Sequence, residues 1–161
     1  MGAVQFARFF FDIYLILSII QYIIFKVLMR IFVFDTETTG FINKNEKDLE
    51  KQPHVIQFAG ILCEVDASGT FSILEEVNVM INPGIPIPYE SSQVHHIYDI
   101  DVKHAPTIEE TIEIIIQHIN TPDILVGHNI DFDQDMIKLE LKRLGREYDY
   151  KPKQTYCTMR E

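Results

Sequence analysis

Short runs of apolar residues predict three successive strands in the first half of the chain. Residues 31–34, 55–65 and 71–81 are rich in aromatic and β-branched side chains, which favour strands. The sequence DASG at 66–69 separates the second run from the third and is typical of a tight turn. These short connections predict an antiparallel meander.

Two later segments carry apolar residues at helical spacing. Thr107 and Glu110 form a capping-box sequence, and isoleucines then recur with the period of a helix. Residues 124–126 form another short apolar strand, and a second helical pattern covers 131–144, with Gly145 as its stop. The order βββαβα predicts an α/β fold with a mixed sheet.

Residues 1–28 differ from the rest of the chain because they are nearly all apolar. The run from Phe9 to Phe25, extended through Leu28, approaches the roughly 20 residues that cross a bilayer. No small-residue cleavage site follows it, which argues against a cleaved signal peptide. Three interpretations stay open: a membrane anchor, a misassigned start upstream of Met29, or a peripheral helix. The flanking basic residues place the following domain, residues 29–161, in the cytoplasm.

The chain of 161 residues carries a formal net charge of −10. Most nucleic-acid-binding proteins are basic, so this charge argues against a protein that wraps duplex DNA by itself. It is compatible with an enzyme that holds a few nucleotides through metal ions, backbone amides and aromatic rings. Cys63 and Cys157 have no metal-ligand spacing, which favours a reducing compartment.

Two acidic residues follow the first predicted strand, in the sequence FDTETTG at 34–40. Because side chains alternate along a strand, Asp35 and Glu37 point to the same side. Neighbouring carboxylates repel each other, and a hard cation such as Mg²⁺ or Mn²⁺ relieves that repulsion. The pair therefore predicts a metal site suited to phosphodiester hydrolysis, with a solvated strand end as the alternative.

A third acidic residue interrupts the apolar face of the last predicted helix. Ile137, Leu141 and Leu144 mark that face, and Asp133 stands four residues before Ile137. We predict that Asp133 is a metal ligand, whereas Asp131 only stabilises the helix N-terminus.

These motifs together resemble the DnaQ-like (DEDD) 3′–5′ exonucleases, a family with a ribonuclease H-like fold. FDTETTG at 34–40 resembles the first motif of the family, and GHNIDFD at 127–133 resembles the second. The family includes the proofreading domains and epsilon subunits of bacterial DNA polymerase III. The resemblance extends from Met29 to about Met159.

A connecting segment supports this resemblance. The sequence QVHHI at 93–97 is similar to the Val-His-Gly-Ile stretch of the family, with His96 in place of the glycine. Because glycine at such a turn often supplies a positive φ, we expect the local backbone to differ here. His95 either faces the substrate cleft or is a loop histidine with satisfied hydrogen bonds.

The resemblance implies a metal-dependent enzyme that removes nucleoside 5′-monophosphates from the 3′ end of single-stranded DNA or RNA. Asp35, Glu37 and Asp133 would be its catalytic residues and would hold two Mg²⁺ or Mn²⁺ ions. DNA polymerase subunits are the expected partners. The residues expected to bind substrate are Thr36, Thr38, Thr39, Phe41, His95 and Asn129. Asn129 is also expected to fix the strand-to-helix turn together with His128.

The family's third motif, a histidine and an aspartate on a late helix, has no counterpart in the sequence. Residues 156–159 resemble the strand upstream of that motif, so we expect the C-terminal elements of the fold to be missing. Three explanations fit this absence: a truncated gene product, a fragmentary gene model, or a chain completed by a partner. The competing functions are a catalytically incomplete nucleic-acid-binding or polymerase-accessory module and a membrane-tethered remnant.

Overall fold

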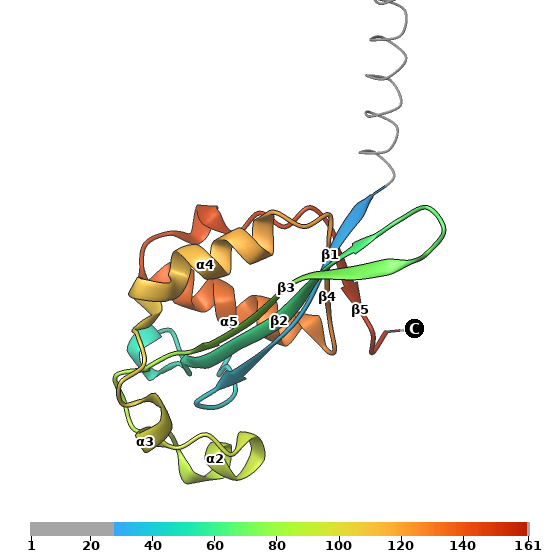
Figure 1. Ribbon diagram of the computed structural model, residues 1–161. Coiled ribbons are helices and arrows are strands. Elements are labelled where there is room, and N and C mark those ends of the chain that lie inside the picture. The colour runs from blue at the N-terminus through green and yellow to red at the C-terminus, as the bar shows by residue number, and fades with distance from the viewer. Residues whose placement is uncertain (1–27, 161) are drawn as a thin grey trace, which may run out of the picture.

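The computed structural model describes residues 28–160, which form a mixed five-stranded sheet with helices packed against it (Figure 1). The strand order is β3-β2-β1-β4-β5. The elements are β1 (Met29–Thr38), η1 (Leu49–Lys51), β2 (Val55–Val65), β3 (Phe71–Met80), α2 (Tyr89–His95), α3 (Asp99–Val102), α4 (Ile108–Asn120), β4 (Ile124–Gly127), α5 (Ile130–Arg143), η2 (Glu147–Asp149) and β5 (Thr155–Cys157).

The first three strands form the predicted antiparallel meander, and β4 then joins β1 in parallel. A parallel neighbour requires a crossover connection, which contains α4. The parallel pairing extends only from Ile31 to Val33 on β1, opposite residues 124–126. The second half of β1 therefore has no strand beside it on the β4 side.

Helices α4 and α5 cover one face of the sheet (Figure 1). Three phenylalanine rings, Phe32 and Phe34 from β1 and Phe58 from β2, lie at the centre of this interface with centroids 5.8 Å apart in each pair. The buried helix residues that pack on them are Ile112, Ile115 and Ile119 of α4 and Ile130, Met136, Ile137 and Leu141 of α5. This burial of apolar surface holds the helices on the sheet.

The structure confirms the α/β class and corrects two local expectations. β1 runs from Met29 to Thr38, so the two acidic residues lie within the strand and not beyond its end. The pairing of β1 with β2 continues through this segment and explains the extra length. Helices α2 and α3 were not expected, because they are short and each buries a single residue.

The opposite face of the sheet is not covered by α4 or α5 and carries exposed apolar side chains. Val33, Ile61 and Ile73, on three adjacent strands, belong to the exposed apolar side chains. The possible membrane anchor at residues 1–28 lies outside the described residues, apart from Leu28. Between residues 28 and 160, the helices are too short or too polar to cross a membrane.

Candidate active site

The alternation of side chains along β1 places its acidic residues on the open face of the sheet. Phe34, Thr36 and Thr38 are buried, whereas Asp35 is exposed and Glu37 is partly exposed. Asp35 pairs with Ala59 across the ladder with β2. The prediction that Asp35 and Glu37 share one side of the strand is consistent with this pattern.

Asp133 is joined directly to β1 through Thr36. Its Oδ1 accepts hydrogen bonds from the Thr36 backbone N–H at 2.9 Å and from the Thr36 hydroxyl at 2.7 Å. The side chain is only 2% exposed. Because β4 ends before this point, the Thr36 amide has no strand partner there, and the carboxylate of α5 takes that place. A residue of the first motif thus holds the acidic residue of the second.

The turn between β4 and α5 brings the helix N-terminus to this position. A Cβ atom on Gly127 would lie 3.1 Å from Ile130 and 3.3 Å from the Phe34 carbonyl oxygen, so glycine permits the close approach. Asn129 then adopts a left-handed conformation, φ 58° and ψ 40°, which asparagine tolerates better than most residues. Asn129 therefore has the predicted turn-forming role.

The three carboxylates influence one another electrostatically. Burial raises the pKa of Asp133 to about 6; hydrogen bonds from Thr36 oppose this shift and the charge of Asp35 adds to it. Burial also raises the pKa of Glu37, as do the charges of Asp35 and Asp133. The pKa of Asp35 is raised by burial, against a hydrogen bond from Thr36 and the charge of His128. Negative charge is concentrated here.

The donor set fits a hard divalent cation by its chemistry. Three carboxylates supply anionic oxygens, and a cation between them would offset the burial and the mutual repulsion that raise the pKa values of Glu37 and Asp133. Within residues 28–160, however, no three acidic, histidine or cysteine side chains are close enough together to form a recognisable metal cluster. Asp35, Glu37 and Asp133 therefore remain predicted ligands.

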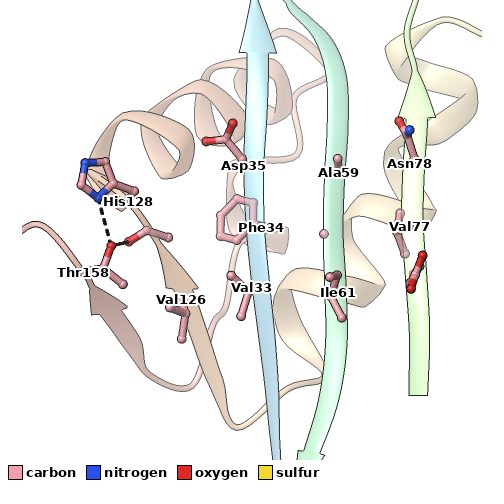
Figure 2. Close-up of a pocket in the computed structure, with 13 residues that line it drawn as sticks. Val33, Phe34, Asp35, Ala59, Ile61, Val77, Asn78, Val126, His128 and Thr158 are labelled. Carbon is pink, nitrogen blue, oxygen red and sulfur yellow. Dashed lines mark hydrogen bonds between the residues drawn. The ribbon is translucent and has the colours of Figure 1, made fainter. Parts of the chain in front are cut away.

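Asp35 also lies at one end of a groove of about 1040 Å³ on the open face of the sheet. Figure 2 shows Asp35 and His128 toward the same end of this groove, with Val33 and Ile61 farther along it. His128 Nδ1 lies 3.1 Å from the hydroxyl of Thr158, beyond β5. The groove is therefore polar beside Asp35 and apolar along Val33 and Ile61, with Glu76 and Asn78 of β3 at its other side.

The turn after β1 is held by hydrogen bonds to two other segments. The Thr38 hydroxyl donates to the Gly40 carbonyl at 2.8 Å. The Thr39 amide donates to the His54 carbonyl at 2.9 Å, and the His54 amide donates to the Thr39 hydroxyl at 2.9 Å. Ser91 of α2 donates to the Thr39 carbonyl at 3.0 Å. Thr38 and Thr39 thus have structural roles that the sequence did not indicate.

An aromatic pair stands beside this turn. Phe41 is 87% exposed, and its ring centroid lies 5.7 Å from that of Phe132 on α5. A small cavity lies between the turn and the start of α5 and also contacts Lys44 and Asn129. Phe132 was missed as a candidate, although it belongs to the second motif, because the sequence does not show that it meets Phe41.

His95 and His96 end helix α2. The Nδ1 atom of His95 accepts a hydrogen bond from the Ile97 amide at 3.0 Å, whereas its Nε2 atom is buried without a hydrogen-bond partner among the described residues. Burial lowers the pKa of His95. The hydrogen bonds of this histidine are therefore only partly satisfied, and its contact with substrate stays a prediction. His96 adopts φ 60°, so the left-handed turn forms without the glycine and the expected backbone difference is not found.

The fold and the arrangement of acidic residues define a class, the ribonuclease H-like nucleases. The structure resembles E. coli exonuclease I, solved in complex with an oligonucleotide, with a TM-score of 0.58, 15% identity and coverage of 80% of this chain and 28% of that chain. It also resembles a 3′-exonuclease that recognises a histone mRNA stem-loop, with a TM-score of 0.53, 13% identity and coverage of 71% and 41%. These likenesses show the fold.

Within this class the chain belongs to the exonuclease family of the RNase T type, whose pattern matches residues 32–160. The chain is 32% identical to the PolC-type DNA polymerase III of Clostridium perfringens over 71% of its length, but this match covers only 7% of the relative. It is 31% identical to the DNA polymerase III subunit epsilon of Treponema pallidum, over 67% of this chain and 44% of that protein. The chain thus spans less than half of these two relatives.

Proposed function

We propose that this protein is a metal-dependent 3′–5′ exonuclease that hydrolyses single-stranded DNA or RNA to nucleoside 5′-monophosphates. The observation that carries the proposal is the pair of hydrogen bonds from Thr36 to Asp133, which links the acidic strand to the acidic helix. Asp35, Glu37 and Asp133 would hold two Mg²⁺ or Mn²⁺ ions. When bound, such ions activate water and stabilise the leaving 3′ oxygen.

The residues around this site would bind and orient the 3′ end. Thr36 fixes the orientation of Asp133, and the turn at Thr38 and Thr39 is rigidly held beside it. The exposed ring of Phe41, supported by Phe132, offers a stacking surface for the terminal base. Asn129 lies against the same small cavity.

A proofreading role beside a DNA polymerase is the proposed biological setting. Its support is the similarity to PolC-type polymerases and to an epsilon subunit. The net charge of −10 agrees with this setting, because a partner that carries the DNA would remove the need for a basic surface.

The test is an exonuclease assay on oligonucleotides labelled at the 5′ end, with Mg²⁺ or Mn²⁺ and with a chelator. We expect products to shorten from the 3′ end only in the presence of metal. Asp35→Asn should lower the rate at least about 10²-fold without unfolding the protein. Glu109→Gln, an exposed acidic residue on α4, is the matched control and should leave the rate unchanged.

Full activity in Asp35→Asn would refute the metal role. Binding of the oligonucleotide without any hydrolysis would instead support the competing proposal, a catalytically incomplete binding or polymerase-accessory module. That alternative is favoured by the lack of a recognisable metal cluster among the described residues.

A further inference from the structure

A largely buried arginine, Arg143, holds the segment before β2 against the C-terminal end of α5. The guanidinium of Arg143 donates to the Leu49 carbonyl from Nε at 3.1 Å and from Nη2 at 2.8 Å. The same Nη2 lies 2.9 Å from the carbonyl oxygens of both Gln52 and Pro53. A lysine has no planar fork and cannot reproduce this set of contacts.

Glu140 completes this attachment one helical turn earlier. Its side chain is 0% exposed, and its Oε2 lies 2.8 Å from Arg143 Nη1. Its Oε1 accepts a hydrogen bond from the Val55 amide at 2.9 Å and lies 3.5 Å from His54 Nδ1. A buried carboxylate is strongly unfavourable unless it is paired in this way. We call Arg143 and Glu140 together the α5 clamp.

The segment held by the α5 clamp is in turn bonded to the turn after β1. His54 and Thr39 exchange two hydrogen bonds, each 2.9 Å long, and Thr39 follows the predicted ligand Glu37 by two residues. Hydrogen bonds on successive residues of the segment 52–55 therefore link the end of α5 to the turn that directly follows the strand carrying Asp35.

Helix α5 is consequently fixed to the sheet region at two points. Asp133 binds Thr36 near the N-terminus of the helix, and Glu140 binds Val55 two turns later. Seven residues of helix span about 10 Å, so the two attachments resist both sliding and rotation of α5.

We infer that Arg143 and Glu140 are positioning residues, which set the place of Asp133 relative to Asp35 and Glu37 by clamping the segment 49–55 onto α5. The inference goes beyond the three acidic residues and rests on the proposed function for its catalytic consequence. The structural coupling itself is independent of any metal or substrate.

The coupling is tested by amide hydrogen exchange on the full chain in a chelator. Arg143→Lys should lower protection at least 10-fold at the amides of Thr36, Thr39 and Val55, while the β2–β3 ladder stays protected. Glu140→Gln keeps the shape of the side chain and should give a weaker change of the same pattern. Arg146→Lys is the matched control, because Arg146 pairs with Glu113 and Asp149 and not with the clamped segment.

A second readout tests the consequence for the site. We expect Arg143→Lys to raise the Mn²⁺ concentration for half-maximal binding several-fold, measured by water proton relaxation, and to lower kcat more than it changes KM. Unchanged exchange at Thr36 and Thr39, or an equal loss of protection in every strand, would overturn the inference. If the unmodified protein neither binds Mn²⁺ nor cleaves, the proposed function fails, and the exchange pattern still decides whether the α5 clamp positions the helix.

Discussion

Asp133 lies on the helix-covered side of β1, where it receives two hydrogen bonds from Thr36 and lies within electrostatic reach of Asp35. Burial raises its pKa to about 6, because the charged form loses hydration that the hydrogen bonds only partly replace. A side chain whose charge is unfavourable in the folded protein is a reasonable ligand for a cation. It also makes the fold sensitive to pH.

We therefore predict that Asp133→Asn stabilises the metal-free protein at neutral and higher pH. Since the folded pKa is raised from 3.8 to about 6, the folded state binds the proton more readily than the unfolded state. The stabilising contribution of the Asp133 proton to the free energy of unfolding is complete below pH 3.8 and is lost as the pH rises through 6. This shift in pKa corresponds to roughly 3 kcal/mol of unfolding free energy. The gain in the variant is smaller than this, because the asparagine accepts weaker hydrogen bonds from Thr36 than the carboxylate does.

Urea unfolding of the full chain in a chelator at pH 4, 6 and 8 provides the measurement. The difference in unfolding free energy between the variant and the unmodified protein should grow with pH. A difference that is the same at all three values would contradict a raised pKa for Asp133.

At the scale of the elements, the contact between β1 and β2 depends on the absence of a side chain at Gly60. A Cβ atom there would lie 2.4 Å from the Phe32 ring and 2.7 Å from the Val33 carbonyl oxygen. The ring of Phe32 can therefore pack with Phe34 and Phe58 only because its neighbour is glycine. The aromatic cluster in turn supports the strand that carries the predicted ligands.

We predict that Gly60→Ala destabilises the protein by about 1–3 kcal/mol, because the ring or the backbone must shift. Phe32→Leu should also destabilise, through loss of packing. The double variant should lose less stability than the sum of the two single losses, since leucine at position 32 is smaller than phenylalanine and makes room for the methyl group that alanine adds at position 60. Thermal or urea unfolding measures all three, and strict additivity would argue against the steric explanation.

Across the whole molecule, acidic charge dominates, with a net charge of −10 and concentrated carboxylates at the candidate site. A nucleic acid is also anionic, so binding must overcome repulsion unless cations intervene. The groove beside Asp35 is mostly apolar and contains no lysine or arginine among the described residues that line it, so it does not offer a basic track. Divalent cations are therefore expected to supply much of the affinity.

We predict that a fluorescent single-stranded oligonucleotide binds at least ten times more tightly with Ca²⁺ than with a chelator. Ca²⁺ is a hard cation that carboxylates bind through oxygen. Fluorescence anisotropy measures the affinity, and Asp35→Asn should remove most of the gain from the ion. Equal affinity under both conditions would show that the protein binds nucleic acid without the predicted metal site.

The sequence by itself predicted the long strands and the two long helices, and it singled out the acidic residues as candidate ligands. The strand at 55–65 and the capped helix starting after Thr107 are as predicted, because local hydrophobic period and capping chemistry decide them. Asp133 was predicted to be a ligand because a charged residue on an apolar helix face is unfavourable without a partner.

Only the tertiary structure decided which groups meet across the fold. Thr36 and Asp133 stand 97 positions apart, and they bond because β4 ends early and leaves an unpaired amide on β1. The α5 clamp reaches across about the same separation, with Arg143 and the Leu49 carbonyl 94 positions apart. Such contacts depend on strand register and helix placement, which arise from packing of the whole core and not from local sequence.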